Sequence, residues 1–171
     1  MQVDPQTLSL VFYPSMVLRK KAQEVDPSDS NVQAVAIRMM ELMHEHEGAG
    51  LAAPQVGLEW RLFVTRDPED PDKAIAWINP TIEVVNAEVE SLEEGCLSLP
   101  DILGNVRRPA GIKITGWNAK GEKTEMESDA FIARVWQHEN DHLDGILIID
   151  KMSAMDRLVN RRAIKKMERS I

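Results

Sequence analysis

Two histidines four residues apart, His138 and His142, with Glu139 directly after the first, form the pattern H-E-x-x-H. On a helix this spacing turns the two rings about 40° apart on one face, so that both can bind one metal ion. A metal lowers the pKa of bound water, and a neighbouring carboxylate can take the water proton. The pattern therefore predicts metal-assisted hydrolysis. Two histidines on a buried helix face can also be hydrogen-bonded core residues.

A helix over this stretch agrees with the residues that flank it. Ser128 or Asp129 can cap its start, and Gly145 can end it in a left-handed conformation. Apolar residues precede the histidines at helical spacing and continue the same face. We therefore expect one inward-facing stripe made of Phe131, Val135, His138 and His142.

A catalytic metal site usually has three protein ligands and one open position, so a third ligand is needed. The metzincin pattern places a histidine where this chain has Ile148, whose side chain cannot bind a metal. A thermolysin-like endopeptidase would use a later carboxylate, and Glu168 is the only glutamate after Glu139. Cys96 is the only thiol, and thiolate binds zinc or ferrous iron well. The pattern slightly favours Cys96 as a ligand over Cys96 as a small buried core residue.

Both helices and strands are predicted among the elements that must position these residues. Apolar spacing predicts a helix from a capping box at Ser30 to Gly48. Strands are predicted over 61–65, 75–78, 82–85, 112–117 and 123–127, with a hairpin turn at 118–121. A C-terminal helix capped by Ser153 covers residues 154–171. The prediction is an α+β fold of mostly antiparallel strands around a central metal-binding helix, with an N-terminal and a C-terminal helix.

Length and composition suit one globular domain that spans residues 1–171. The chain has 43% hydrophobic and 28% charged residues, which is ordinary for a soluble protein. The first residues lack a signal peptide pattern, and no apolar run approaches the roughly 20 residues that cross a bilayer. The single cysteine excludes an internal disulfide and fits a reducing compartment. We expect a cytoplasmic monomer without membrane contact.

Three segments resemble the motifs of the peptide deformylase family, in that family's order and spacing. They are Gly48-Ala49-Gly50-Leu51-Ala52-Ala53-Pro54-Gln55, Glu94-Gly95-Cys96-Leu97-Ser98-Leu99-Pro100 and Gln137-His138-Glu139-Asn140-Asp141-His142-Leu143-Asp144-Gly145. The likeness extends from about Leu10 to Met152. It implies a hydrolase that removes the N-formyl group from the formylmethionine of newly made polypeptides and releases formate. The alternatives are the endopeptidase above and a non-catalytic metal-binding or translation-associated module.

The resemblance also implies the metal and the catalytic residues. Cys96, His138 and His142 would bind one divalent metal, usually ferrous iron in this family, which zinc, nickel or cobalt can replace. Glu139 would act as general base and acid towards a metal-bound hydroxide. The side-chain amide of Gln55 and the backbone N–H of Leu97 would stabilise the oxyanion.

The same resemblance indicates how the substrate binds. The backbone at Gly50 and Gly48 would align the peptide, because a chain without Cβ atoms allows close approach. The methionine side chain would enter a pocket walled by residues one and two turns before His138. We expect these to be Phe131 and Val135, together with part of the first motif, and we also place Arg134 among the substrate-binding residues. Arg134 departs from an apolar wall, and it either snorkels outward or binds the substrate.

Carboxylates near the motifs could support the ligands. A ligating histidine usually donates its second ring N–H to a carbonyl or carboxylate. Glu94, Asp141 or Asp144 could accept it, could pair with Arg107 or Arg108, or could form a solvated acidic face.

Charge is unevenly spread along the chain. The net charge is −8, but from Lys151 onward seven basic residues accompany two acidic ones, so this segment carries +5 and residues 1–150 carry −13. The last helix should dock by an apolar side and expose a basic one. The apolar side contains Val159, Ala163, Ile164, Met167 and Ile171, and the basic side contains Arg157, Arg161, Lys165 and Arg169. The basic side is either a solvated face or a contact for ribosomal RNA near the exit of nascent chains.

Overall fold

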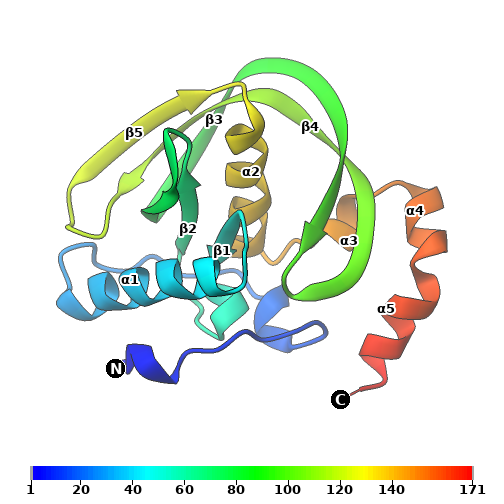
Figure 1. The fold of residues 1–171 in the computed structure, drawn as a ribbon, viewed down its shortest axis with the longest axis horizontal. Helices are drawn as coiled ribbons and strands as arrows, with labels where there is room; N and C mark the ends of the chain where they lie inside the picture. The colour runs from blue at the N-terminus through cyan, green and yellow to red at the C-terminus, as the bar shows by residue number, and fades with distance from the viewer. Residues whose placement is uncertain (1, 171) are drawn as a thin grey trace.

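The computed structural model describes residues 2–170 and contains one five-stranded antiparallel sheet with strand order β1-β2-β3-β4-β5 (Figure 1). The strands are β1 (Gly50–Ala52), β2 (Leu62–Asp67), β3 (Asp70–Cys96), β4 (Leu99–Trp117) and β5 (Lys123–Ser128). The helices are α1 (Ser30–Glu45), α2 (Phe131–Leu143), α3 (Ile148–Lys151), α4 (Ala154–Val159) and α5 (Arg161–Glu168), with 3-10 turns η1 (Pro5–Thr7), η2 (Met16–Arg19) and η3 (Ala53–Val56). The predicted α+β class is confirmed.

The strands β3 and β4 are far longer than the sequence pattern suggests, and their ribbon arches past α2 (Figure 1). We expected a break at Asn79-Pro80, but β3 continues through it because the register with β4 shifts between Ile78 and Thr81. Proline is tolerated at such a bulge, where the ladder is already interrupted. The side chain of Asn79 also bonds both backbone groups of Val25. Because β3 is uninterrupted, its last residue, Cys96, lies next to α2.

Helix α1 confirms the predicted apolar face but not the predicted ends. Its cap is Asp29 rather than Ser30, since the Asp29 carboxylate accepts from two free backbone amides of the first turn. The helix ends at Glu45, and Glu47 takes a left-handed conformation before Gly48. The buried face packs on the sheet through Val32, Val35, Ala36, Met39, Leu42 and Met43.

Helix α2 starts later than predicted and ends as predicted. Neither Ser128 nor Asp129 is its N-cap residue. The N-cap is Ala130, whose backbone N–H donates to Ser128 Oγ. Gly145 has a φ of 73°, and a Cβ there would lie 2.5 Å from the carbonyl oxygen of Arg19. Glycine is therefore required at this end of the helix.

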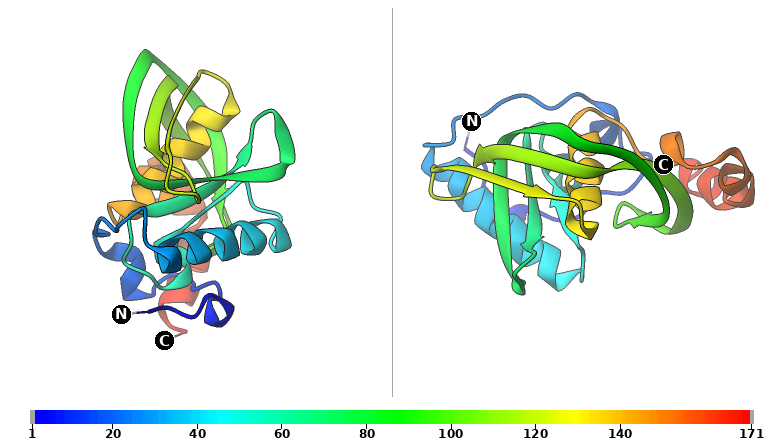
Figure 2. Two further views of the ribbon diagram at one scale, coloured as in Figure 1. Left: turned by 90° about the vertical axis from the view of Figure 1, so that its left-hand side faces the viewer. Right: turned by 90° about the horizontal axis from the view of Figure 1, so that it is seen from above.

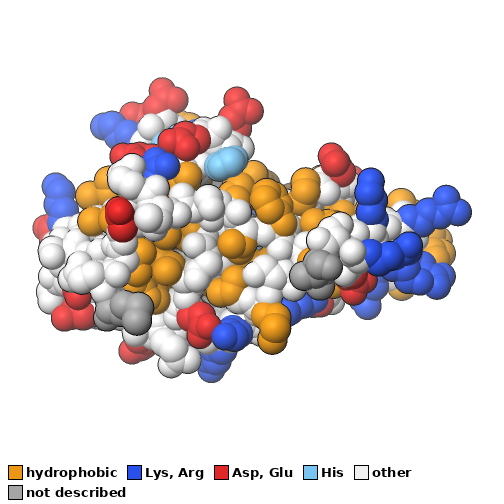
Figure 3. Space-filling model, turned by 90° about the horizontal axis from the view of Figure 1, so that it is seen from below, with side chains coloured by type: hydrophobic (Ala, Val, Ile, Leu, Met, Phe, Trp, Pro, Cys, Tyr) orange, Lys and Arg blue, Asp and Glu red, His pale blue; other side chains and the backbone are white. Residues whose placement is uncertain are grey.

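The basic C-terminal segment is two helices instead of the single helix predicted over 154–171. Ser153 caps α4 as predicted, but the chain turns at Asn160 and continues as α5; residue 171 lies outside the described part. Val159 was expected on the packed side and is 74% exposed, whereas Ala163, Ile164 and Met167 pack against the core. Lys and Arg side chains gather over this end of the molecule (Figure 3). Figure 2 shows α4 and α5 at the opposite end from α1.

No helix within residues 2–170 has the length and apolar content to cross a membrane.

Candidate metal centre and active site

Cys96, His138 and His142 come together in space. The thiol stands at the end of β3, and the two imidazoles stand one turn apart on α2. One ligand atom from each residue lies within 4.8 Å of the other two, and Cys96 Sγ is 3.4 Å from His142 Nε2. The three potential ligands predicted from sequence therefore form one cluster.

A buried carboxylate holds His138 in place. Glu94 Oε1 lies 2.9 Å from His138 Nδ1, so the other ring nitrogen is left for the cluster. Arg108 donates two bonds to this carboxylate, at 2.7 and 3.0 Å, and a third to Asp141 at 2.8 Å. Burial raises the pKa of Glu94, but hydrogen bonds from His138 and Arg108 outweigh it and hold that pKa well below its ordinary value. Of the carboxylates that we considered, Glu94 orients the histidine and Asp141 pairs with Arg108.

Arg134 is neither an outward-snorkelling residue nor free to bind a carboxylate. Its side chain is buried, and Nη1 donates to Glu94 Oε2 at 2.7 Å and to the Val106 carbonyl at 2.8 Å. Nη2 donates to the Glu90 carbonyl at 2.8 Å. Arg134 lies on the same face of α2 as His138, one turn before it. Its guanidinium therefore lies beside the carboxylate of Glu94, which also bonds the histidine. Arg134 still borders the pocket.

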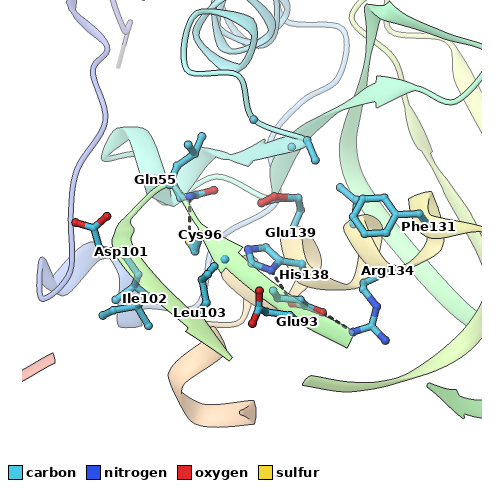
Figure 4. A pocket seen from close by; sticks show the side chains of 18 residues that line it. Gln55, Glu93, Cys96, Asp101, Ile102, Leu103, Phe131, Arg134, His138 and Glu139 are labelled. Atoms are coloured by element: carbon cyan, nitrogen blue, oxygen red, sulfur yellow. Dashed lines mark hydrogen bonds and ion pairs between the residues drawn. The ribbon is translucent and has the colours of Figure 1, made fainter. Parts of the chain in front are cut away.

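A pocket of about 390 Å³ opens beside the cluster, bounded by the glycine-rich segment, the cysteine segment and α2 (Figure 4). Val135 is buried in its wall, and Phe131 is 63% exposed. Two of the three ligands, Cys96 and His138, border this space. So do all the substrate-binding and catalytic residues predicted from sequence, which are Gly48, Gly50, Gln55, Leu97, Phe131, Arg134, Val135 and Glu139.

Glu139 faces this pocket from α2 and is only 2% exposed. Burial raises its pKa to about 7, which suits a group that must both take and return a proton near neutral pH. A Cβ on Gly50 would lie 2.8 Å from Glu139 Cγ. The glycine in the first motif therefore leaves room for this carboxylate.

The side chain of Gln55 is buried and fixed in one orientation. Its Oε1 accepts from the Ala52 N–H at 2.9 Å, which directs Nε2 towards Cys96 Sγ at 3.6 Å and Ser98 Oγ at 3.3 Å. Figure 4 shows this amide pointing at the thiol. An N–H donor thus stands beside the ligand cluster. Ser98, which sequence reasoning passed over, is fully buried and bonds the Val11 carbonyl at 2.9 Å.

The donor set fits a divalent metal. One sulfur and two nitrogens leave a further coordination position, as in catalytic sites with three protein ligands. Burial lowers the pKa of His142 well below its ordinary value, so its imidazole is neutral, as a ligand must be. Burial also lowers the pKa of His138, but hydrogen bonds to Cys96 and Glu94 outweigh this and raise it well above its ordinary value. A metal bound at the cluster would therefore have to displace a proton from His138.

Glu168, the alternative third ligand, lies on α5 and accepts a hydrogen bond from the Tyr13 hydroxyl at 3.3 Å. It is not part of the ligand cluster found among residues 2–170. Sequence reasoning also passed over three residues that border the pocket, namely Glu93, Asp101 and Ile102. Their only signal was their nearness to the cysteine segment.

Comparison with known proteins gives the family of the chain. The sequence model of the family described as polypeptide deformylase matches residues 7–158. A peptide deformylase of Thermotoga maritima is 43% identical over 155 residues, covering 91% of this chain and 93% of that protein. The crystal structure of a plant peptide deformylase superposes with a TM-score of 0.90 at 34% identity, over 99% of this chain and 92% of that one. A Plasmodium falciparum peptide deformylase in complex with an inhibitor gives 0.85 at 35% identity, over 95% and 100%. The chain belongs to the peptide deformylase family.

Proposed function

We propose that this protein is a metal-dependent hydrolase that removes the N-formyl group from the formylmethionine of newly made polypeptides and releases formate. One observation carries the proposal: Cys96, His138 and His142 cluster at the wall of a pocket that also holds Glu139 and Gln55. Family membership gives this arrangement its substrate class. We assign the whole chain, residues 1–171, to one catalytic domain with residues 154–171 as a basic C-terminal arm.

In the proposed mechanism the protein supplies proton transfer and charge stabilisation. A metal bound by the three ligands would provide Lewis-acid activation of water and of the formyl oxygen. Glu139 takes a proton from the attacking water and returns it to the departing amine, a pair of tasks that its raised pKa suits. The Gln55 amide and the Leu97 N–H donate to the oxyanion, and one such donor is worth about 3 kcal/mol.

Substrate positioning is assigned to the pocket wall. The backbone at Gly48 and Gly50 aligns the formyl group and the peptide, and the methionine side chain lies against Val135 and Phe131. Arg134 contributes through the part of its side chain that borders the pocket, because its guanidinium is engaged by Glu94 and two carbonyls.

The metal that we propose for the cell is ferrous iron, with zinc, nickel or cobalt able to replace it. A thiolate and two imidazoles bind all of these ions, so the donor set supports the site without selecting one ion. Metal analysis after anaerobic purification tests the assignment. Zinc alone, at full occupancy, would contradict it.

The proposed partners are formylated nascent chains, met in the cytoplasm by a monomeric enzyme. Six exposed cations on α4, on α5 and at the C-terminal cap of α5 also support ribosome contact through RNA: Arg157, Arg161, Arg162, Lys165, Lys166 and Arg169. Replacing Arg161, Lys165 and Arg169 by glutamine should weaken co-sedimentation with ribosomes and flatten its salt dependence. Unchanged co-sedimentation would remove the ribosome from the proposal.

Formate release tests the proposed reaction. A formyl-Met-Ala-Ala amide should yield formate and a free amine, and the matched acetyl-Met-Ala-Ala amide should not. Cleavage of an internal peptide bond without formate release would favour the endopeptidase instead.

A further inference from the structure

Ser98, two residues after Cys96, has a fully buried hydroxyl that the proposed mechanism does not use. Ser98 is not among the residues that border the pocket. Its Oγ nevertheless lies 3.3 Å from Nε2 of Gln55, the side chain assigned to the oxyanion. Any effect of Ser98 on a bound peptide must therefore pass through Gln55 or through another residue of the pocket wall.

Backbone groups at both ends fix the direction of the hydrogen bond between Gln55 and Ser98. At one end, the Ala52 N–H donates to Gln55 Oε1 at 2.9 Å, so the donor Nε2 is the atom that faces Ser98. At the other end, the Val11 carbonyl can only accept, so the single hydrogen of the Ser98 hydroxyl is donated to it, at 2.9 Å. The hydroxyl oxygen then offers Gln55 only its lone pairs. The three groups form a chain of hydrogen bonds with one possible direction, from Gln55 through Ser98 to Val11.

This chain of hydrogen bonds gives the two N–H groups of the Gln55 amide different partners. One N–H donates to Ser98, and Nε2 lies 3.6 Å from Cys96 Sγ, at which the amide points (Figure 4). The second N–H is therefore the one directed at the space beside the ligand cluster. Without an acceptor at Ser98, the amide would be held only through its oxygen, by Ala52, and its nitrogen could turn away from that space.

The acceptor at the end of the chain is itself held in place, by a segment outside the three motifs. Val11 donates its N–H to the Gln55 carbonyl at 2.8 Å, and Tyr13 donates its N–H to the Ser98 carbonyl at 3.0 Å. Residues 11–13 thus bind the backbones of the first and the second motif together. The Val11 carbonyl cannot move away from the Ser98 hydroxyl without breaking these bonds.

Resting on the proposed function, we propose that Ser98 is a positioning residue: its hydroxyl, held by the Val11 carbonyl, fixes the Gln55 amide so that one N–H points at the oxyanion. Ser98 acts through Gln55 and touches neither the substrate nor the ligand cluster's open side. The oxyanion forms only in the transition state, so loss of the hydroxyl should lower kcat and leave KM and metal content nearly unchanged.

The expected loss is smaller than that of the donor itself. Removing an oxyanion donor outright lowers kcat by about 10²- to 10³-fold. In Ser98→Ala the donor is still present but is held at one end only, so we expect a fall in kcat of roughly 5- to 30-fold. The substitution removes one oxygen atom and adds no bulk, so it does not overpack the buried site.

The test is a double-mutant cycle on the metal-loaded full-length protein, with kcat and KM measured on a formyl-Met-Ala-Ala amide. Ser98→Ala should lower kcat roughly 5- to 30-fold in the wild-type background. In the Gln55→Ala background the same change should lower kcat less than about twofold, because the group that Ser98 positions is gone. A serine with only a structural role would lower kcat by the same factor in both backgrounds.

Thr65→Val is the matched control. It also removes a buried hydroxyl that accepts from one side chain, Trp77 Nε1 at 3.4 Å, and Thr65 does not border the pocket. This variant should keep the wild-type kcat. Circular dichroism and metal analysis establish that each variant is folded and loaded, and Ser98→Gly, which also lacks the hydroxyl, enters the same cycle if the alanine variant does not fold.

Equal factors in the two backgrounds would overturn the proposal, and so would a wild-type kcat in Ser98→Ala or a loss that appears only in KM or in metal content. The same coupled loss in Thr65→Val would overturn it as well. Formate release by the wild type separates these outcomes from failure of the proposed function. If the wild type releases formate, only the role of Ser98 is refuted. If the metal-loaded wild type releases none, the deformylase assignment itself is refuted.

Discussion

Glu94 Oε1 lies 2.9 Å from His138 Nδ1, while Oε2 of the same carboxylate accepts from Arg108 and Arg134, both at 2.7 Å. One buried anion therefore joins a potential metal ligand to two buried cations from β4 and α2. The position of the ligand depends on this charge cluster, of which Glu94 and Arg134 also border the pocket.

Replacing Glu94 by glutamine should weaken metal binding about 10- to 100-fold, because the carboxylate that orients His138 becomes a neutral amide. The change should also lower the free energy of unfolding by about 3–5 kcal/mol, since the buried guanidinium of Arg134 loses its anion and that of Arg108 keeps only Asp141. Metal titration and urea unfolding measure the two effects. Glu93→Gln, the exposed neighbour, is the control for both; an equal loss there would contradict the role of the buried cluster.

The lowered pKa of Glu94 makes the stability of the protein depend on pH. Its folded-state pKa is well below the ordinary value of 4.5, so Glu94 contributes stability that is present above pH 4.5. That contribution is lost as the pH falls from there towards the folded-state pKa. Urea midpoints between pH 6 and pH 3 should fall more steeply in the wild type than in Glu94→Gln. Parallel curves would show that Glu94 is not the group that titrates.

Replacing Glu139 by glutamine should leave metal binding unchanged and lower kcat by about 10²- to 10⁴-fold, because the amide cannot take or return a proton. Glutamine is nearly isosteric, so the fold is retained. Formate release and metal analysis on the same sample check both parts. A variant that kept more than a tenth of the wild-type kcat would remove Glu139 from the proton transfer.

Gly50→Ala should reduce activity by displacing the Glu139 side chain. The new Cβ would lie 2.8 Å from Glu139 Cγ, and such overpacking typically costs about 1–3 kcal/mol. Gly95→Ala is the comparison variant, because its nearest neighbour, at 2.9 Å, is the flexible end of Leu103. Thermal unfolding and kcat should both fall in Gly50→Ala and change less in Gly95→Ala. Wild-type kinetics in Gly50→Ala would contradict the close approach.

Features of the site that depend on one helix alone could be predicted from the sequence. The i, i+4 spacing of His138 and His142 and the left-handed Gly145 follow from helix geometry alone. The ligand cluster forms only if Cys96 lies next to α2, although Cys96 is 42 residues before His138 in the chain. Spacing left Cys96 only slightly favoured, and the long β3 is what brings it there.

Tertiary context decided what the local rules could not. Pro80 is a strand breaker in isolation, yet a register shift lets β3 pass it. Arg134 resembles an exposed or substrate-binding cation on a helical pattern, and only the buried Glu94 from another element explains its position. The turn at Asn160 likewise depends on a partner outside the helix, because Asn160 Nδ2 bonds the Leu103 carbonyl at 2.8 Å.

We propose that Cys96, His138 and His142 hold one metal ion and that formate release requires this ion. The most direct measurement records metal content and formate release together, in the wild type and in Cys96→Ala, before and after chelation and ferrous iron replacement under anaerobic conditions. We expect one ion per chain in the wild type, with activity lost on chelation and restored on replacement. Cys96→Ala should have neither bound metal nor activity. A Cys96→Ala protein that kept a stoichiometric metal and its activity would contradict it.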